Sequence, residues 1–176
     1  MYGATDEAYI ADIYYAASAQ IVAKATEVLG LEETRQEYQK IADRQWQVVK
    51  EEYFTATGRC AVKTQTGLIL ALKYHLSENE ELTKQMLQKL LRDNKNKLNT
   101  GFVGTPLLCN VLTDHGMTDA AYRLLLNKEY PGWLHEVKLG ATTVWERWNS
   151  LDESGHVSST GMNSLNHYSY GAVSVS

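Results

Sequence analysis

A glutamate flanked by two tryptophans is the arrangement in this sequence best suited to chemistry. Glu146 lies between Trp145 and Trp148, within residues 142–148. Indole faces stack on the apolar C–H faces of a sugar ring, and a carboxylate can activate a water molecule or bind hydroxyl groups. The pattern therefore favours a carbohydrate site. The alternative is a surface carboxylate paired with Arg147, which is disfavoured because adjacent residues on a helix do not face each other.

The surrounding tract, residues 129–167, is rich in Gly, Ser and Asn and holds three of the four tryptophans and three of the five histidines. Functional side chains concentrate in such loops when a rigid scaffold holds them. Trp133 and Trp145 are candidate stacking platforms, with core packing as the alternative. His167 is a candidate sugar contact, with a hydrogen-bonded core histidine as the alternative.

Other chemistries fit the sequence poorly. The histidines show no metal-ligand spacing and no Cys-x-x-Cys is present, so we expect no metal site and no cofactor. Cys60 and Cys109 are expected to be free thiols. Ser150, Asp152 and His156 lack a Gly-x-Ser-x-Gly elbow and do not indicate a triad, and there is no glycine-rich phosphate loop.

Composition excludes further classes. The 176 residues are 44% hydrophobic and 22% charged, with a net charge of -4. These values are typical of one globular domain or part of a larger one, and the acidic balance argues against nucleic-acid binding. No apolar run is long enough to span a membrane, and the first residues lack the features of a signal peptide, so we expect a cytoplasmic protein without a membrane partner.

The elements that must position the tract are helices, because apolar residues recur at intervals of three and four and only two prolines interrupt the chain. The predicted helices span 6–29, 32–54, 64–75, 80–92, 105 to near 116, and 118 to before 130, with a last piece from Met162 or Asn163. Thr5 is the expected N-cap of the first helix and Gly30 its C-terminal stop. Its expected buried face consists of Ile10, Ile13, Tyr14, Ala17, Ile21, Ala25 and Val28.

The fold class predicted from these elements is all-α. No stretch shows the alternation of a strand, and apolar helices alternate with amphipathic ones, which favours an inner and an outer layer. Such an array closes into a toroid or runs open as a solenoid, and the lack of a strict repeat weakens the solenoid.

Four segments of the chain together carry a family resemblance. They are residues 101–106 (GFVGTP), 130–133 (YPGW), 140–148 (GATTVWERW) and 161–173 (GMNSLNHYSYGAV). In order and spacing they resemble the bacterial α-L-rhamnosidases of glycoside hydrolase family 78. The resemblance implies that residues 1–176 are the C-terminal portion of an (α/α)6-barrel catalytic domain, incomplete at both ends, that is, a partial toroid of about seven helices.

The resemblance also implies a mechanism and a partner, a rhamnose-containing glycoside. Family members invert the anomeric centre with two carboxylic residues. The general base of the family matches Glu146, and Trp133, Trp145 and His167 become candidate substrate contacts. Because a base must be ionised, we expect a hydrogen-bond donor or cation beside Glu146. The general acid of the family has no equivalent in this chain.

Two functions remain open at this point. The first is a fragment of an inverting α-L-rhamnosidase that acts on terminal α-L-rhamnosides and lacks its general acid. The second is a non-catalytic helical half-barrel that serves as a carbohydrate-binding or interaction module. In either case, helix faces left open at the edges of an incomplete barrel favour self-association.

Overall fold

The computed structural model describes residues 4–159, 161 and 163–175 of this chain, and the regular secondary structure of that part consists of helices. The helices are α1 (Glu7–Val28), α2 (Glu32–Tyr53), α3 (Gln65–Lys73), α4 (Glu80–Asp93), α5 (Thr105–Asp114), α6 (Thr118–Leu125), α7 (Trp133–Lys138), α8 (Tyr168–Gly171) and the 3-10 turn η1 (Ala172–Val175). Within the described residues there is no strand, and β pairing is limited to two isolated bridges.

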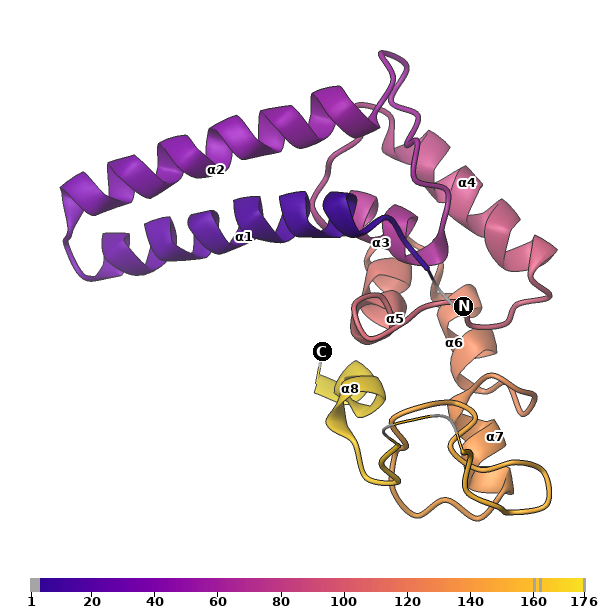
Figure 1. The fold of residues 1–176 in the computed structure, drawn as a ribbon. Helices are drawn as coiled ribbons and strands as arrows, with labels where there is room; N and C mark the ends of the chain where they lie inside the picture. Colours follow the sequence, from indigo (N-terminus) through magenta and orange to yellow (C-terminus); the bar gives the residue numbers. More distant parts are fainter. Residues whose placement is uncertain (1–3, 160, 162, 176) are drawn as a thin grey trace.

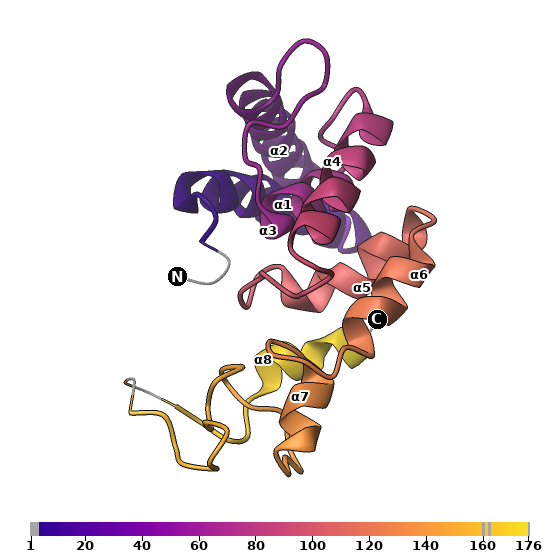
Figure 2. The same cartoon turned by 90° about the vertical axis from the view of Figure 1, so that its right-hand side faces the viewer.

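Consecutive helices form antiparallel pairs that are arranged along an arc (Figure 1). The pairs are α1–α2, α3–α4 and α5–α6, and the first member of each pair also contacts the first member of the next. Helix α5 in turn contacts α8 and η1. These two elements directly follow the irregular tract of residues 129–167 in the sequence. Figure 2 shows the arc from the side, with α7 and α8 at the end away from α2. The prediction of a partial α/α toroid with inner and outer layers is confirmed.

Helix α3 forms the centre of the core. Every residue from Gln65 to Leu72 is buried, as expected for a helix that is apolar all round. Gly67 allows this close packing, because a Cβ atom there would lie 2.7 Å from a methyl carbon of Val62. The Tyr9 hydroxyl of α1 donates to the carbonyl oxygen of Gly67 at 3.0 Å and ties two inner helices together.

The buried face of α1 differs from the predicted one. Ile13 and Ala17 are buried as expected and Ile10 is half-buried, but Tyr14, Ile21, Ala25 and Val28 are exposed. The buried residues in the second half of α1 are small, namely Ala19, Ala23 and Thr26. Helix α2 is the main packing partner of α1, and small side chains permit the close approach of the two helices. The apolar periodicity therefore predicted the helix correctly and its buried face only in part.

Local details at the helix ends also correct the sequence predictions. Asp6, and not Thr5, caps α1 by accepting a hydrogen bond from the Tyr9 N–H at 3.0 Å, and the Thr5 hydroxyl pairs with that of Thr64. Gly30 takes the predicted C-terminal position with a φ of 71°. The tract expected to be irregular contains the six-residue helix α7, which is too short to show a clear period.

The last helical piece, α8, begins at Tyr168 and not at Asn163, while Met162 lies outside the described residues.

Cys60 and Cys109 are free, as predicted, and burial raises the pKa of both thiols. None of the described helices has the length and apolar character required to cross a bilayer.

Candidate active site

The segment that carries Glu146 is held by the segment that precedes α8. The Glu146 N–H donates to the carbonyl oxygen of Ser164 at 2.9 Å, and the His167 N–H donates to that of Val144 at 2.8 Å. The Ser164 N–H in turn donates to Oε2 of Glu146 at 2.8 Å. This last contact is the donor expected from the sequence. The backbone N–H of Ser164 therefore fixes the position of the Glu146 carboxylate.

A cavity of about 440 Å³ opens beside the half-buried Glu146. Its wall is largely aromatic, with contributions from loops before α5 and α7 and from α8. The lining includes Phe102, Tyr130, Glu146, Arg147, Trp148 and Tyr170. An apolar pocket with a few convergent polar groups is the usual form of a small-molecule site.

Three rings of the aromatic wall contact one another in sequence. The rings of Trp148 and Tyr170 lie 4.1 Å apart at an interplanar angle of 6°, and Phe102 packs against Tyr170 at 5.2 Å. Phe102 also stacks on His167, with ring centroids 5.3 Å apart. Burial and the nearby Glu136 carboxyl raise the pKa of Tyr170 to about 12, so its hydroxyl stays protonated at neutral pH.

Trp133 lies behind this wall, and Trp145 is buried beside Glu136. Trp145 is only 2% exposed and Trp133 is also buried. The Trp133 indole N–H donates to the carbonyl oxygen of Tyr170 at 3.0 Å, and its ring meets Trp148 edge-on. Their burial favours the packing alternative over direct stacking on a sugar, and places them as supports for the residues that line the cavity.

Glu136 is a buried carboxyl that sequence reasoning missed. It is 2% exposed, and its Oε2 accepts a hydrogen bond from the N–H of Trp145 at 3.3 Å. Its Oε1 has no hydrogen-bond partner among the described residues. Burial raises the pKa of Glu136 to about 7, opposed by the hydrogen bond from Trp145. Glu136 thus fixes the backbone of the residue that immediately precedes Glu146.

The aromatic lining was also missed in part. Phe102 and Tyr170 lie within segments used for the family resemblance, yet nothing in their spacing indicated that they share one cavity with Glu146. Trp148 was the one residue whose position beside Glu146 in the sequence signalled its role.

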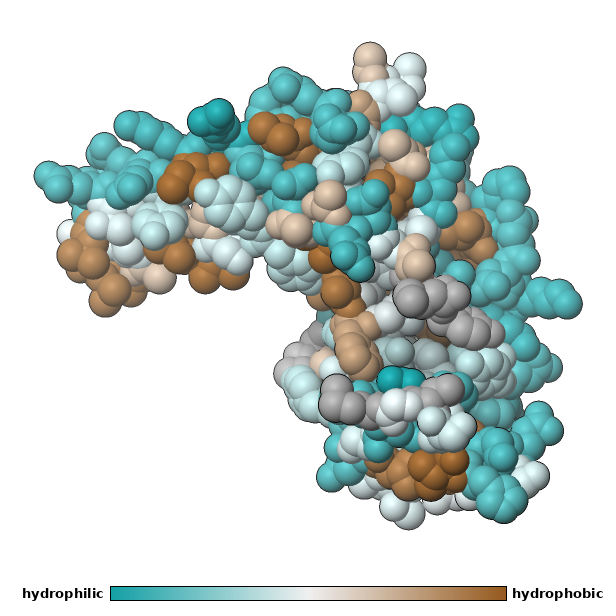
Figure 3. Space-filling model, viewed as in Figure 1, coloured by the Kyte–Doolittle hydropathy of each residue, from teal (hydrophilic) through white to brown (hydrophobic). Residues whose placement is uncertain are grey.

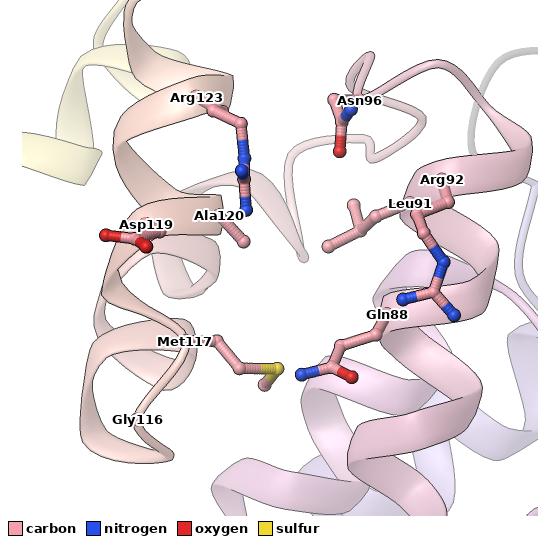
Figure 4. A pocket seen from close by; sticks show the side chains of 9 residues that line it. All are labelled: Gln88, Leu91, Arg92, Asn96, Gly116, Met117, Asp119, Ala120 and Arg123. Atoms are coloured by element: carbon pink, nitrogen blue, oxygen red, sulfur yellow. The ribbon is translucent and has the colours of Figure 1, made fainter.

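A second cavity, of about 460 Å³, lies elsewhere on the arc. Figure 4 shows Gln88 and Leu91 of α4 facing Met117 and Ala120 at the start of α6. It shares no lining residue with the cavity beside Glu146. It is a groove between two outer helices and takes no part in the site.

Paired helices carry an aromatic-lined cavity with a carboxylate at its edge, an arrangement that suits an enzyme acting on sugars. Comparison with known families agrees with this class. The model of the bacterial alpha-L-rhamnosidase 6 hairpin glycosidase domain matches residues 1–175. The chain therefore belongs to the six-hairpin glycosidase domain family of the bacterial α-L-rhamnosidases.

Individual relatives support the assignment. The chain is 40% identical over 174 residues to an alpha-L-rhamnosidase of Formosa agariphila and 36% identical over 171 residues to one of Streptomyces avermitilis, covering 97% and 96% of this chain. Among solved structures, native Aspergillus terreus α-L-rhamnosidase matches with a TM-score of 0.91 at 32% identity, over 97% of this chain and 20% of that one. The Streptomyces avermitilis enzyme complexed with L-rhamnose matches with a TM-score of 0.85 at 36% identity, over 94% of this chain and 16% of that one.

The chain spans only part of these proteins. It covers 19% of the length of the Formosa relative and 16% of the Streptomyces one.

Proposed function

We propose that this chain is the C-terminal part of the catalytic domain of an inverting α-L-rhamnosidase, in which Glu146 is the general base. The substrate class is terminal α-L-rhamnosides. The observation that carries the proposal is the position of Glu146: its carboxylate takes a hydrogen bond from the Ser164 N–H at 2.8 Å and borders an aromatic-lined cavity.

In the proposed reaction, Glu146 accepts a proton from a water molecule as the water oxygen attacks the anomeric carbon. The bond from that carbon to the leaving oxygen breaks on the opposite face of the ring, and a second carboxylic acid protonates the leaving oxygen. In inverting enzymes the two carboxyl groups lie about 6.5–9.5 Å apart, which leaves room for the water. We propose that the second group comes from outside these 176 residues.

His167 is suited to bind a sugar hydroxyl. Its Nδ1 accepts a hydrogen bond from the Ser169 N–H at 3.2 Å, so the neutral ring carries its proton on Nε2. The stack against Phe102 holds the ring plane, which leaves the Nε2–H as a fixed donor. Trp133 and Trp145, the other predicted substrate contacts, support the site from behind through Tyr170 and Glu136.

A graft tests the proposed function. The segment of the Streptomyces avermitilis relative that matches this chain is replaced by the chain itself, and hydrolysis of 4-nitrophenyl α-L-rhamnoside is measured. We expect turnover, because the graft restores both carboxyl groups to one domain. A chimera that folds, as judged by circular dichroism, and binds L-rhamnose without turnover would favour the carbohydrate-binding alternative.

The isolated chain is expected to show no measurable hydrolysis of the same substrate, because Glu146 has no general acid to act with. The assay uses the purified chain and its Glu146→Gln variant at equal concentration. Turnover by the chain that disappears in the variant would contradict the missing acid, since a proton donor would then be present in the chain or its oligomer.

Self-association is a further expectation. Figure 3 shows apolar side chains along one edge of the α1–α2 hairpin. Val28 is 87% exposed, and Ile21 and Leu29 are also exposed. Contiguous apolar surface drives association, so light scattering of the chain should give the mass of a dimer or a larger species. The double variant Ile21→Lys, Val28→Lys should give the mass of a monomer. A monomer at high concentration would contradict this.

The cytoplasmic location stays a prediction.

A further inference from the structure

Two histidines and a glutamate from three different elements converge at one point on the surface. His75 follows α3, Glu80 is the first residue of α4, and His115 caps the C-terminus of α5. One potential ligand atom from each residue can be chosen so that all three lie within 4.8 Å of one another. Their spacing along the chain predicts no metal site, because only the packing of the helix pairs brings them together.

The distances suit a shared cation. Nδ1 of His75 lies 2.5 Å from Oε1 of Glu80, and Nε2 of His115 lies 3.8 Å from Oε2 of the same carboxylate. Zinc binds histidine nitrogen and carboxylate oxygen at about 2.0–2.2 Å, so an ion between these atoms requires only small side-chain movements. The carboxylate supplies the negative charge that a site with two neutral imidazoles needs.

His115 is preorganised for this role. Its Nδ1 lies 2.9 Å from the carbonyl oxygen of Val111, which can only accept, so Nδ1 carries the proton. The lone pair is then on Nε2, the atom that faces Glu80. The His115 side chain is only 11% exposed, so its ring is held in place by its surroundings. A backbone carbonyl that fixes the tautomer of a histidine is the usual outer partner of a metal ligand.

His75 occupies a backbone position that favours glycine. Its φ is 51°, in the left-handed region, and the Leu76 N–H bonds back to the Ala71 carbonyl at 3.0 Å, as in a helix ending with glycine. A histidine is disfavoured in this conformation, yet it directs its ring to Glu80. The corresponding turn after α5 does use glycine, at Gly116.

We propose that His75, Glu80 and His115 bind a divalent transition metal of the zinc type, with water completing the coordination. The ion links the α3–α4 pair to the α5–α6 pair at the C-terminal ends of the inner helices α3 and α5. Phe102, which lines the cavity beside Glu146, precedes the opposite end of α5. The ion therefore acts as a structural clamp between two helix pairs and takes no part in hydrolysis.

The test is a titration of the purified chain with Zn²⁺, followed by calorimetry and by thermal unfolding, with Mg²⁺ as the comparison ion. We expect one Zn²⁺ per chain, and an increase in Tm of about 5 °C or more at a hundredfold excess over Kd. Mg²⁺ should give no increase, because it prefers oxygen ligands.

Variants identify the ligands. His75→Gln and His115→Gln should each raise the Kd for Zn²⁺ at least about tenfold, with each Tm compared with and without the ion in the same variant. The control is His156→Gln, because His156 lies 3.7 Å from Asp152 in an exposed histidine–carboxylate pair outside the cluster. No Zn²⁺ binding at millimolar concentration would overturn the proposal. The proposal would also be overturned if His156→Gln raised the Kd for Zn²⁺ while His75→Gln and His115→Gln left it unchanged.

Discussion

Replacing Glu146 by Gln is expected to lower the kcat of rhamnoside hydrolysis by about 10²–10⁴-fold, the contribution typical of a positioned general base. Glutamine has the same shape and keeps an oxygen that can accept from the Ser164 N–H, which now bonds to Oε2 of Glu146 at 2.8 Å. It cannot take a proton from the attacking water. The loss should therefore fall on kcat, with KM little changed, and it is measured in the chimera with 4-nitrophenyl α-L-rhamnoside.

The matched control for this loss is Glu153→Gln. Glu153 is an exposed glutamate in the same irregular tract and makes no contact with the cavity beside Glu146. Its replacement removes the same charge and should leave kcat within about twofold of the parent, as expected for a surface charge outside the site. Equal activities for the two variants would exclude Glu146 as the base.

Replacing Glu136 by Gln is expected to change how the stability of the chain depends on pH. The carboxyl has an ordinary pKa of 4.5, and burial raises its pKa to about 7 in the folded chain. Between these two values the folded state binds more protons than the unfolded state. The free energy of unfolding therefore falls as pH rises through this window and levels off above it. The shift corresponds to a loss of about 3 kcal/mol in total.

The Glu136→Gln variant lacks this titration. Its free energy of unfolding, relative to that of the parent, should thus rise by about 3 kcal/mol between pH 4 and pH 8. Urea unfolding at a series of pH values measures the difference, and any constant cost of the buried amide cancels in the comparison. Glu153→Gln again serves as the control. Parallel curves for parent and Glu136→Gln would show that Glu136 has an ordinary pKa in the folded chain.

The helices were largely predictable because their signal is local. A continuous apolar segment predicted the buried helix α3, and alternation of apolar and amphipathic helices predicted the two layers. The exposed half of α1 and the short helix α7 were not predictable in this way. Exposure of Ile21 and Val28 depends on which helices pack nearby, and a helix of six residues has fewer than two turns to show a period.

The same difference between local signals and contacts between elements decides which parts of the candidate site were predictable. Glu146 was predicted as the carboxylate of the site because it lies between Trp145 and Trp148 in the sequence. The donor beside it is a backbone N–H at Ser164, 18 residues away, and a backbone group leaves no mark in a sequence. Glu136 and the cluster of His75, Glu80 and His115 depend on contacts between elements, so their surroundings emerge only from the fold.

The most direct test of Glu146 as general base is azide rescue of a Glu146→Ala chimera. The shortened side chain leaves room for azide, which attacks the anomeric carbon as the bond to the aryl oxygen breaks and the general acid protonates that oxygen. We predict that azide restores turnover and that the product is β-L-rhamnosyl azide, with inverted configuration. Turnover that azide fails to restore, or a product with retained α configuration, would contradict the assignment of Glu146 as the base of an inverting enzyme.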